Sequence, residues 1–84
     1  MFSVEFSSQA KKFLKKSDKE LAARIIKKSE NLSVEPFPSD AKRVVNRQEK
    51  IFRVRVGDYR IQYYVLYDKN LIFITEIEKR PKAY

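Results

Sequence analysis

The sequence contains no cysteine and no histidine, and only one glycine and three prolines among 84 residues. The lack of cysteine excludes a disulfide framework, a thiol nucleophile and thiolate metal ligands. The lack of histidine removes the usual zinc sites, the Ser-His-Asp and Cys-His constellations, and the commonest acid–base side chain near neutral pH. Any chemistry must therefore come from Arg, Lys, Tyr, Asp, Glu, Ser or Thr, and we expect neither a metal nor a small-molecule cofactor.

Long apolar runs are also missing. The N-terminal stretch MFSVEFSSQAKK is too polar for a signal peptide, and no window approaches the length of a membrane span. We expect a cytoplasmic protein without a membrane partner. With 43% apolar residues and so few glycines and prolines, the composition predicts one globular domain spanning residues 1–84.

Positive charge is abundant and uneven. The chain carries 19 basic and 11 acidic residues, a net charge of +8. Residues 41–84 hold eleven of the basic and five of the acidic side chains, so most of the excess lies in that half. Such an excess favours polyanionic partners, either nucleic acid or an acidic protein. The lysines of residues 11–28 are explained more simply as solvated helix surface.

Two helices are predicted near the N-terminus. Residues 2–6 alternate apolar and polar side chains, as a half-buried strand does, and Ser7 or Ser8 can cap a helix after it. The run from Ser17 to Glu20 has capping-box spacing, with Ser17 as the cap of a second helix that continues to about residue 32. Antiparallel helices joined this closely can cover one face of a sheet.

The rest of the chain is rich in strand-forming residues. A polar, basic connector at residues 42–50 precedes three β-branched and aromatic runs, at residues 51–56, 59–67 and 71–77. Short turns make these runs antiparallel neighbours. The predicted fold is α+β: a small, mainly antiparallel sheet in β-α-α-β-β-β order, with the helical hairpin packed on one face.

The turn at Gly57-Asp58 fixes the register of the first hairpin. Glycine tolerates the positive φ that a type II′ turn requires at its first central position. The apolar side chains then share one face, namely Phe52, Val54, Val56, Tyr59, Ile61 and Tyr63. The opposite face carries three arginines, namely Arg53, Arg55 and Arg60.

This register sets Arg55 directly across from Arg60. Like charges in that position destabilise a sheet, and cross-strand pairs are typically worth about 0.2–1 kcal/mol. Two explanations remain open. A phosphate group can bridge the guanidinium groups, which are planar, bidentate donors and always charged. Alternatively, an internal carboxylate such as Glu76 or Glu78 can relieve the repulsion.

The residues around this hairpin resemble a known family. The segment FRVRVGDYRIQYYV, followed by one more strand and then KRPKAY, resembles the RelE branch of the RelE/ParE superfamily of toxins from type II toxin–antitoxin systems. The order of strands and helices agrees over essentially the whole chain. This resemblance implies a RelE-like, microbial ribonuclease-type fold.

The resemblance also implies a function. RelE toxins are metal-independent endoribonucleases that cut messenger RNA in the ribosomal A site, by attack of a 2′-hydroxyl on the adjacent phosphate, and so inhibit translation. A cognate antitoxin, the ribosome and mRNA are the implied partners. The implied catalytic residues are Arg55, Arg60, Arg80 and Tyr84, and the expected RNA-binding residues are Lys50, Arg53, Lys79 and Lys82.

One departure leaves the general base open. Well-studied members have lysines where this chain has Arg53 and Arg55, and one of those lysines is a favoured base. Arginine stays protonated, so Tyr84 or a ribosomal group has to remove the proton here. Two other functions remain alternatives: a ParE-like inhibitor of DNA gyrase, which has the same fold, and a basic RNA- or ribosome-binding module without catalysis.

Overall fold

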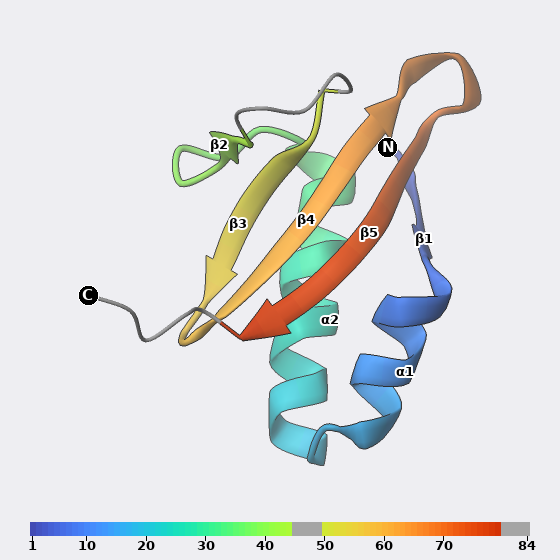
Figure 1. The fold of residues 1–84 in the computed structure, drawn as a ribbon. Coiled ribbons are helices and arrows are strands. Elements are labelled where there is room, and N and C mark those ends of the chain that lie inside the picture. The colour runs from blue at the N-terminus through green and yellow to red at the C-terminus, as the bar shows by residue number, and fades with distance from the viewer. Residues whose placement is uncertain (45–49, 80–84) are drawn as a thin grey trace.

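The computed structural model describes residues 1–44 and 50–79 and shows a five-stranded sheet with two helices on one side (Figure 1). The sheet order is β1-β5-β4-β3-β2. β1 pairs with β5 in parallel, and the other neighbours are antiparallel. The elements are β1 Ser3–Phe6, α1 Ser8–Lys16, α2 Lys19–Val34, β2 Lys42–Arg43, β3 Phe52–Val56, β4 Tyr59–Leu66, a 3-10 turn Tyr67–Lys69 and β5 Leu71–Lys79.

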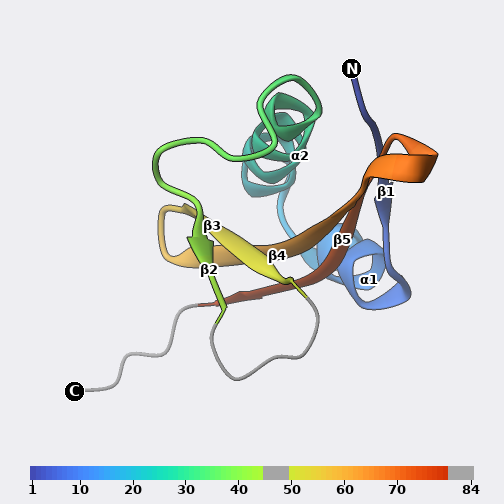
Figure 2. The ribbon, with the colours of Figure 1, turned by 90° about the horizontal axis from the view of Figure 1, so that it is seen from above.

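The predicted fold class is confirmed. Figure 2 shows α2 over one face of the sheet and α1 beside the edge formed by β1. The short strand β2 lies inside the segment that was predicted as a connector at residues 42–50. Among the described residues, no helix is long and apolar enough to cross a membrane.

The helix caps agree with the prediction at one helix and correct it at the other. Ser7 caps α1, and its hydroxyl accepts a hydrogen bond from the backbone N–H of Ala10 at 3.1 Å. The cap of α2 is Asp18, whose carboxylate accepts from the backbone N–H of Leu21 at 2.8 Å. The prediction of Ser17 as this cap is wrong, because Ser17 ends α1 and its hydroxyl donates to the carbonyl of Phe13. A carboxylate also suits the positive end of the helix dipole better than a hydroxyl does.

The core lies between α2 and the covered face of the sheet. Its buried residues come from both helices and from β3, β4 and β5: Ala10, Ile25, Leu32, Val54, Val56, Ile61, Tyr63, Ile72, Ile74 and Ile77. The Tyr63 hydroxyl donates to the Pro36 carbonyl at 2.7 Å and so attaches the segment after α2 to the sheet. Burial raises the pKa of this phenol, and the nearby charge of Asp40 adds to the effect, so Tyr63 stays neutral.

A β-bulge in β5 determines which side chains reach the open face. Gln62 pairs with Glu76 while Tyr63 pairs with Ile74, so Thr75 is an extra residue on β5. The extra residue shifts the alternation of side chains by one position. As a result Ile77 enters the core, whereas Glu76 and Glu78 lie on the face opposite the helices.

The start of α1 holds the C-terminal end of β5 in place. β1 pairs only with residues 71–74 of β5. After residue 74, side chains from the start of α1 and its cap make hydrogen bonds to the backbone of β5. The Gln9 side chain donates to the carbonyl of Ile77 at 2.8 Å and accepts from its N–H at 2.9 Å. The Ser7 hydroxyl donates to the carbonyl of Thr75 at 2.7 Å. These contacts fix the backbone beside Glu78.

Candidate functional site

The β3–β4 hairpin has the predicted register. Val56 pairs with Tyr59, Arg55 with Arg60, and Arg53 with Gln62. Gly57 has a φ of +58°, and Asp58 is not among the described residues with positive φ, which is the pattern of the predicted type II′ turn. We call the open side of the sheet at Arg53, Arg55 and Arg60 the arginine face.

A fourth cation reaches the arginine face from the edge strand. Lys42 of β2 pairs with Arg53, and paired residues of neighbouring strands project to the same side of a sheet. Lys42 was not predicted as part of this face, because residue 42 was expected to lie in a connector. The only signal was a basic Lys42-Arg43 pair ahead of Val44, which is weak without knowledge of the partner strand.

Arg60 makes an ion pair within the arginine face. Its Nη2 donates to Oε1 of Glu78 at 2.9 Å, and the two side chains are 22% and 30% exposed. The Nε of Arg60 is buried and has no acceptor among the described residues. The structure thus shows that Glu78 relieves the repulsion between Arg55 and Arg60, which was one of the two explanations left open. Binding of a phosphate remains a prediction.

The open face of the sheet is basic on one side and acidic on the other. The cations lie on β2, β3 and the first part of β4, whereas β5 contributes Glu76 opposite Gln62 and Glu78 opposite Arg60. Glu76 also takes part in an interaction of its own. The arginine face is therefore a basic surface with an acidic border along one strand. The positive charge of this face is therefore concentrated on the β3 side.

Two predicted RNA-binding residues lie in different surroundings from the arginines. Lys50 is exposed and lies two residues before the first residue of β3, Phe52. Lys79 pairs with Tyr59 and lines a groove of about 470 Å³ with Phe13 and Lys16, on the helix side of the sheet. It does not share the face of Arg60. The predictions for Arg80, Lys82 and Tyr84 lie outside the described residues.

The chemistry available on this face is that of guanidinium donors. No group of three or more Asp, Glu, His or Cys side chains able to hold a metal ion occurs within residues 1–44 and 50–79. Arginines can bind a phosphodiester through paired N–H donors and stabilise negative charge that develops on it. They do not remove protons at working pH.

Comparisons with known proteins find relatives over nearly the whole chain. A family model described as the ParE toxin of the type II toxin–antitoxin system parDE matches residues 4–84. A protein of Methanocaldococcus jannaschii whose name assigns it to the RelE toxins is 35% identical over 86 residues, which cover 99% of this chain and 94% of that protein.

Solved structures show the same architecture. A chain of the archaeal RelE–RelB complex from Pyrococcus horikoshii is similar with a TM-score of 0.83 and 27% identity, over 98% of both chains. A chain of the toxin–antitoxin complex RelBE2 from Mycobacterium tuberculosis has a TM-score of 0.80 at 24% identity, over 94% of this chain and 98% of that one. At that identity the second likeness concerns the fold alone.

Proposed function

The chain belongs to the RelE/ParE superfamily of toxins from type II toxin–antitoxin systems, and we propose that it is a ribosome-dependent endoribonuclease that cleaves mRNA in the A site. The observation that carries this proposal is the arginine face. Arg55 and Arg60 are cross-strand neighbours, and Arg53 lies on the same side of β3. Three guanidinium groups at this spacing suit a phosphodiester better than any neutral ligand.

In the proposed reaction, the 2′-oxygen of one nucleotide attacks the adjacent phosphorus and the bond to the 5′-oxygen of the next nucleotide breaks. The 2′-hydroxyl loses its proton to a base, and the 5′-oxygen takes up a proton as it leaves. The products are a 2′,3′-cyclic phosphate and a 5′-hydroxyl. Arg55 and Arg60 stabilise the negative charge that develops on the phosphoryl oxygens. Arg80 and Tyr84 are proposed to complete the site.

Proton removal is the step that the arginines do not perform. Tyr84 and a ribosomal group remain the two candidates for the base. This proposal explains the dependence on the ribosome. If the ribosome holds the mRNA in the geometry for attack, positioning alone supplies much of the increase in reaction rate. The ion pair with Glu78 adds one requirement. To bind the phosphate, Arg60 must either leave the Glu78 carboxylate or donate to the carboxylate and the phosphate at the same time.

A cognate antitoxin is the second proposed partner. The similar chain from Pyrococcus was solved in a RelE–RelB complex. A basic, open sheet face is a suitable target for an acidic antitoxin segment, which would compete with RNA for the same cations. We propose that the antitoxin of this chain covers the arginine face.

Cleavage is tested in a translation extract with purified protein. We expect arrested translation and mRNA fragments that end in cyclic phosphates at ribosome-bound codons. Arg60→Ala should lower the cleavage rate by about 10²–10³, the usual effect of removing one such donor. Lys12→Ala, an exposed change on α1, is the matched control and should cleave normally. Full activity of a folded Arg60→Ala variant would refute the role of this residue.

Inhibition of DNA gyrase is the second candidate, because the matching family model is that of a ParE toxin. A supercoiling assay separates the two functions. Loss of gyrase activity without mRNA cleavage would favour the ParE function. RNA binding with intact RNA ends and normal supercoiling would indicate a binding module without catalysis.

A further inference from the structure

A second basic surface lies between α2 and the β3–β4 turn and shares Arg55 with the arginine face. We call it the turn groove. Figure 1 shows this turn beside the N-terminal half of α2. The groove has a volume of about 360 Å³, and its lining consists of Arg24, Lys27, Lys28, Asn31, Arg55, Val56 and Gly57. The α2 residues recur at intervals of three and four, so they share one face of the helix.

Gly57 allows α2 and the turn to approach closely. A Cβ atom at this position would stand 3.2 Å from Nη2 of Arg24. That separation is tight for a real contact, so with a side chain at residue 57 the guanidinium group would have to shift by a few tenths of an ångström. Glycine at this position thus lets Arg24 lie close against the turn.

The turn groove has an excess of positive charge. Lys28 is compensated by Asp40, which lies 2.9 Å away. Within the described part of the chain, Arg24, Lys27 and Arg55 make no ion pair, and no acidic residue lines the groove. These three cations are exposed to solvent, and Arg24 also lines an adjoining groove with Asp18 and Glu20. Their arrangement around one concave surface nevertheless favours an anionic ligand there.

We propose that the turn groove binds a backbone phosphate of RNA, at a second position in addition to the scissile phosphate. The choice of RNA rests on the proposed function. Arg55 connects the two positions, because it is paired with Arg60 on the arginine face and also lines the groove. A bound strand would thus run from the arginine face around the edge of β3 to α2.

An acidic protein segment fits this groove less well. Protein interfaces are anchored by aromatic and apolar side chains in their buried centres. The only apolar side chain in the lining is Val56, which is 8% exposed and belongs to the core. The remaining lining offers hydrogen-bond donors, which is what phosphate oxygens need.

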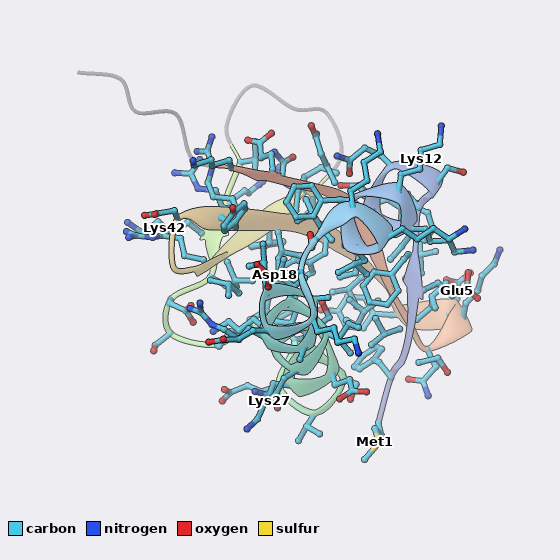
Figure 3. The ribbon with its side chains drawn as sticks, turned by 90° about the horizontal axis from the view of Figure 1, so that it is seen from below. Met1, Glu5, Lys12, Asp18, Lys27 and Lys42 are labelled. Atoms are coloured by element: carbon cyan, nitrogen blue, oxygen red, sulfur yellow. The ribbon has the colours of Figure 1, made fainter. Side chains whose placement is uncertain are left out.

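Binding of a fluorescent 2′-O-methyl RNA oligonucleotide, followed by anisotropy over a range of salt concentrations, tests this proposal. The capped 2′-oxygen prevents cleavage, so the result does not depend on catalysis. The test variant is Arg24→Gln/Lys27→Gln. The control is Lys11→Gln/Lys12→Gln, which removes the same charge from exposed positions on α1. Figure 3 shows Lys12 and Lys27 on different helices, far from each other.

We expect the test variant to bind more weakly than the control, with a slope of log affinity against log salt that is flatter by about 0.7, the contribution of one neutralised phosphate of a single strand. Lys27→Gln alone, an exposed change that leaves Arg24 in place, should weaken binding and flatten the slope by less than the double variant does. Equal affinity and slope in test and control variants would overturn the proposal. So would an absence of RNA binding by the wild type, or a defect confined to an acidic peptide probe.

The outcomes for the proposed function remain distinguishable. If the wild type cleaves no mRNA but the groove variants still lose RNA affinity, the nuclease function fails and the second phosphate site stands. If mRNA is cleaved and the groove variants bind RNA as the control does, the second site fails alone. In the extract, the groove variants should need more protein for half-maximal cleavage and reach the same maximal rate.

Discussion

Replacing Glu78 by glutamine should make this protein bind RNA more tightly. In the free protein the Glu78 carboxylate holds Nη2 of Arg60 at 2.9 Å. A phosphate that binds the arginine face must compete with this contact. Glutamine keeps the size and shape of the side chain and removes its charge, so Glu78→Gln releases Arg60 without leaving a cavity.

The size of the gain follows from the burial of the pair. The side chains are 22% and 30% exposed, so the ion pair lies between two limits. Fully exposed pairs are worth at most about 1 kcal/mol, and breaking a buried pair costs about 3–5 kcal/mol. A contribution of about 1–2 kcal/mol is therefore expected, which corresponds to about 5- to 30-fold in affinity at 1.4 kcal/mol per factor of ten.

The assay is anisotropy with the 2′-O-methyl RNA oligonucleotide at low salt. Glu5→Gln is the matched control, because it makes the same change in charge on β1, at the edge of the sheet opposite Lys42 (Figure 3). Arg60→Ala supplies the coupling test. If Glu78 acts through Arg60, the gain from Glu78→Gln should largely disappear in the Arg60→Ala background. An equal gain in both backgrounds, or a gain no larger than that of Glu5→Gln, would refute the reasoning.

Three further predictions concern stability. Tyr63→Phe removes the hydrogen bond to Pro36 and leaves a carbonyl without its donor, so urea unfolding should show a loss of about 1–2 kcal/mol, whereas an unchanged midpoint would contradict that role. Gly57→Ala places a side chain at a φ of +58°, and thermal unfolding should show a loss of about 1–2 kcal/mol; equal stability would mean that the turn has changed type. The Lys28 ammonium lowers the pKa of Asp40 below its ordinary value, so this pair stabilises the fold at neutral pH and stops doing so as the pH falls below about 4. Unfolding of wild type and Asp40→Asn should differ by at most about 1 kcal/mol at pH 7 and not at pH 2, because the pair is exposed; a gap that persists at pH 2 would point to another cause.

The hairpin could be predicted from the sequence because local features determine it. One glycine limits the turn to a position with positive φ, and strict alternation on both sides of it fixes the register. Helix periodicity likewise predicted α1 and α2. The cap of α2 was misplaced by one residue because Ser17 and Asp18 are both good caps, and the choice depends on how α1 ends.

Features that depend on distant partners could not be predicted. β2 has two residues and becomes a strand only through its pairing with β3. In β5 the spacing from Ile74 to Ile77 breaks the two-residue period, but the resulting bulge is defined by the partner strand. This bulge decides that Glu78 meets Arg60 and that Lys79 projects to the other face. The shared face of Arg53, Arg55 and Arg60 could therefore be predicted from the hairpin register, while the surroundings of Glu78 and Lys79 required the structure.

The parallel pairing of β1 with β5 has a consequence for the order of events during synthesis. β5 is made after the other four described strands, yet it lies between β1 and β4. Hydrogen bonds from Ser7 and Gln9 at the beginning of the chain also end on β5, 68 residues later. A nascent chain that stops before Leu71 has no strand on which β1 or the start of α1 can dock. Because contacts this distant in sequence need β5 and cost the entropy of closing a long loop, the arginine face should gain its supporting sheet only after β5 has been made.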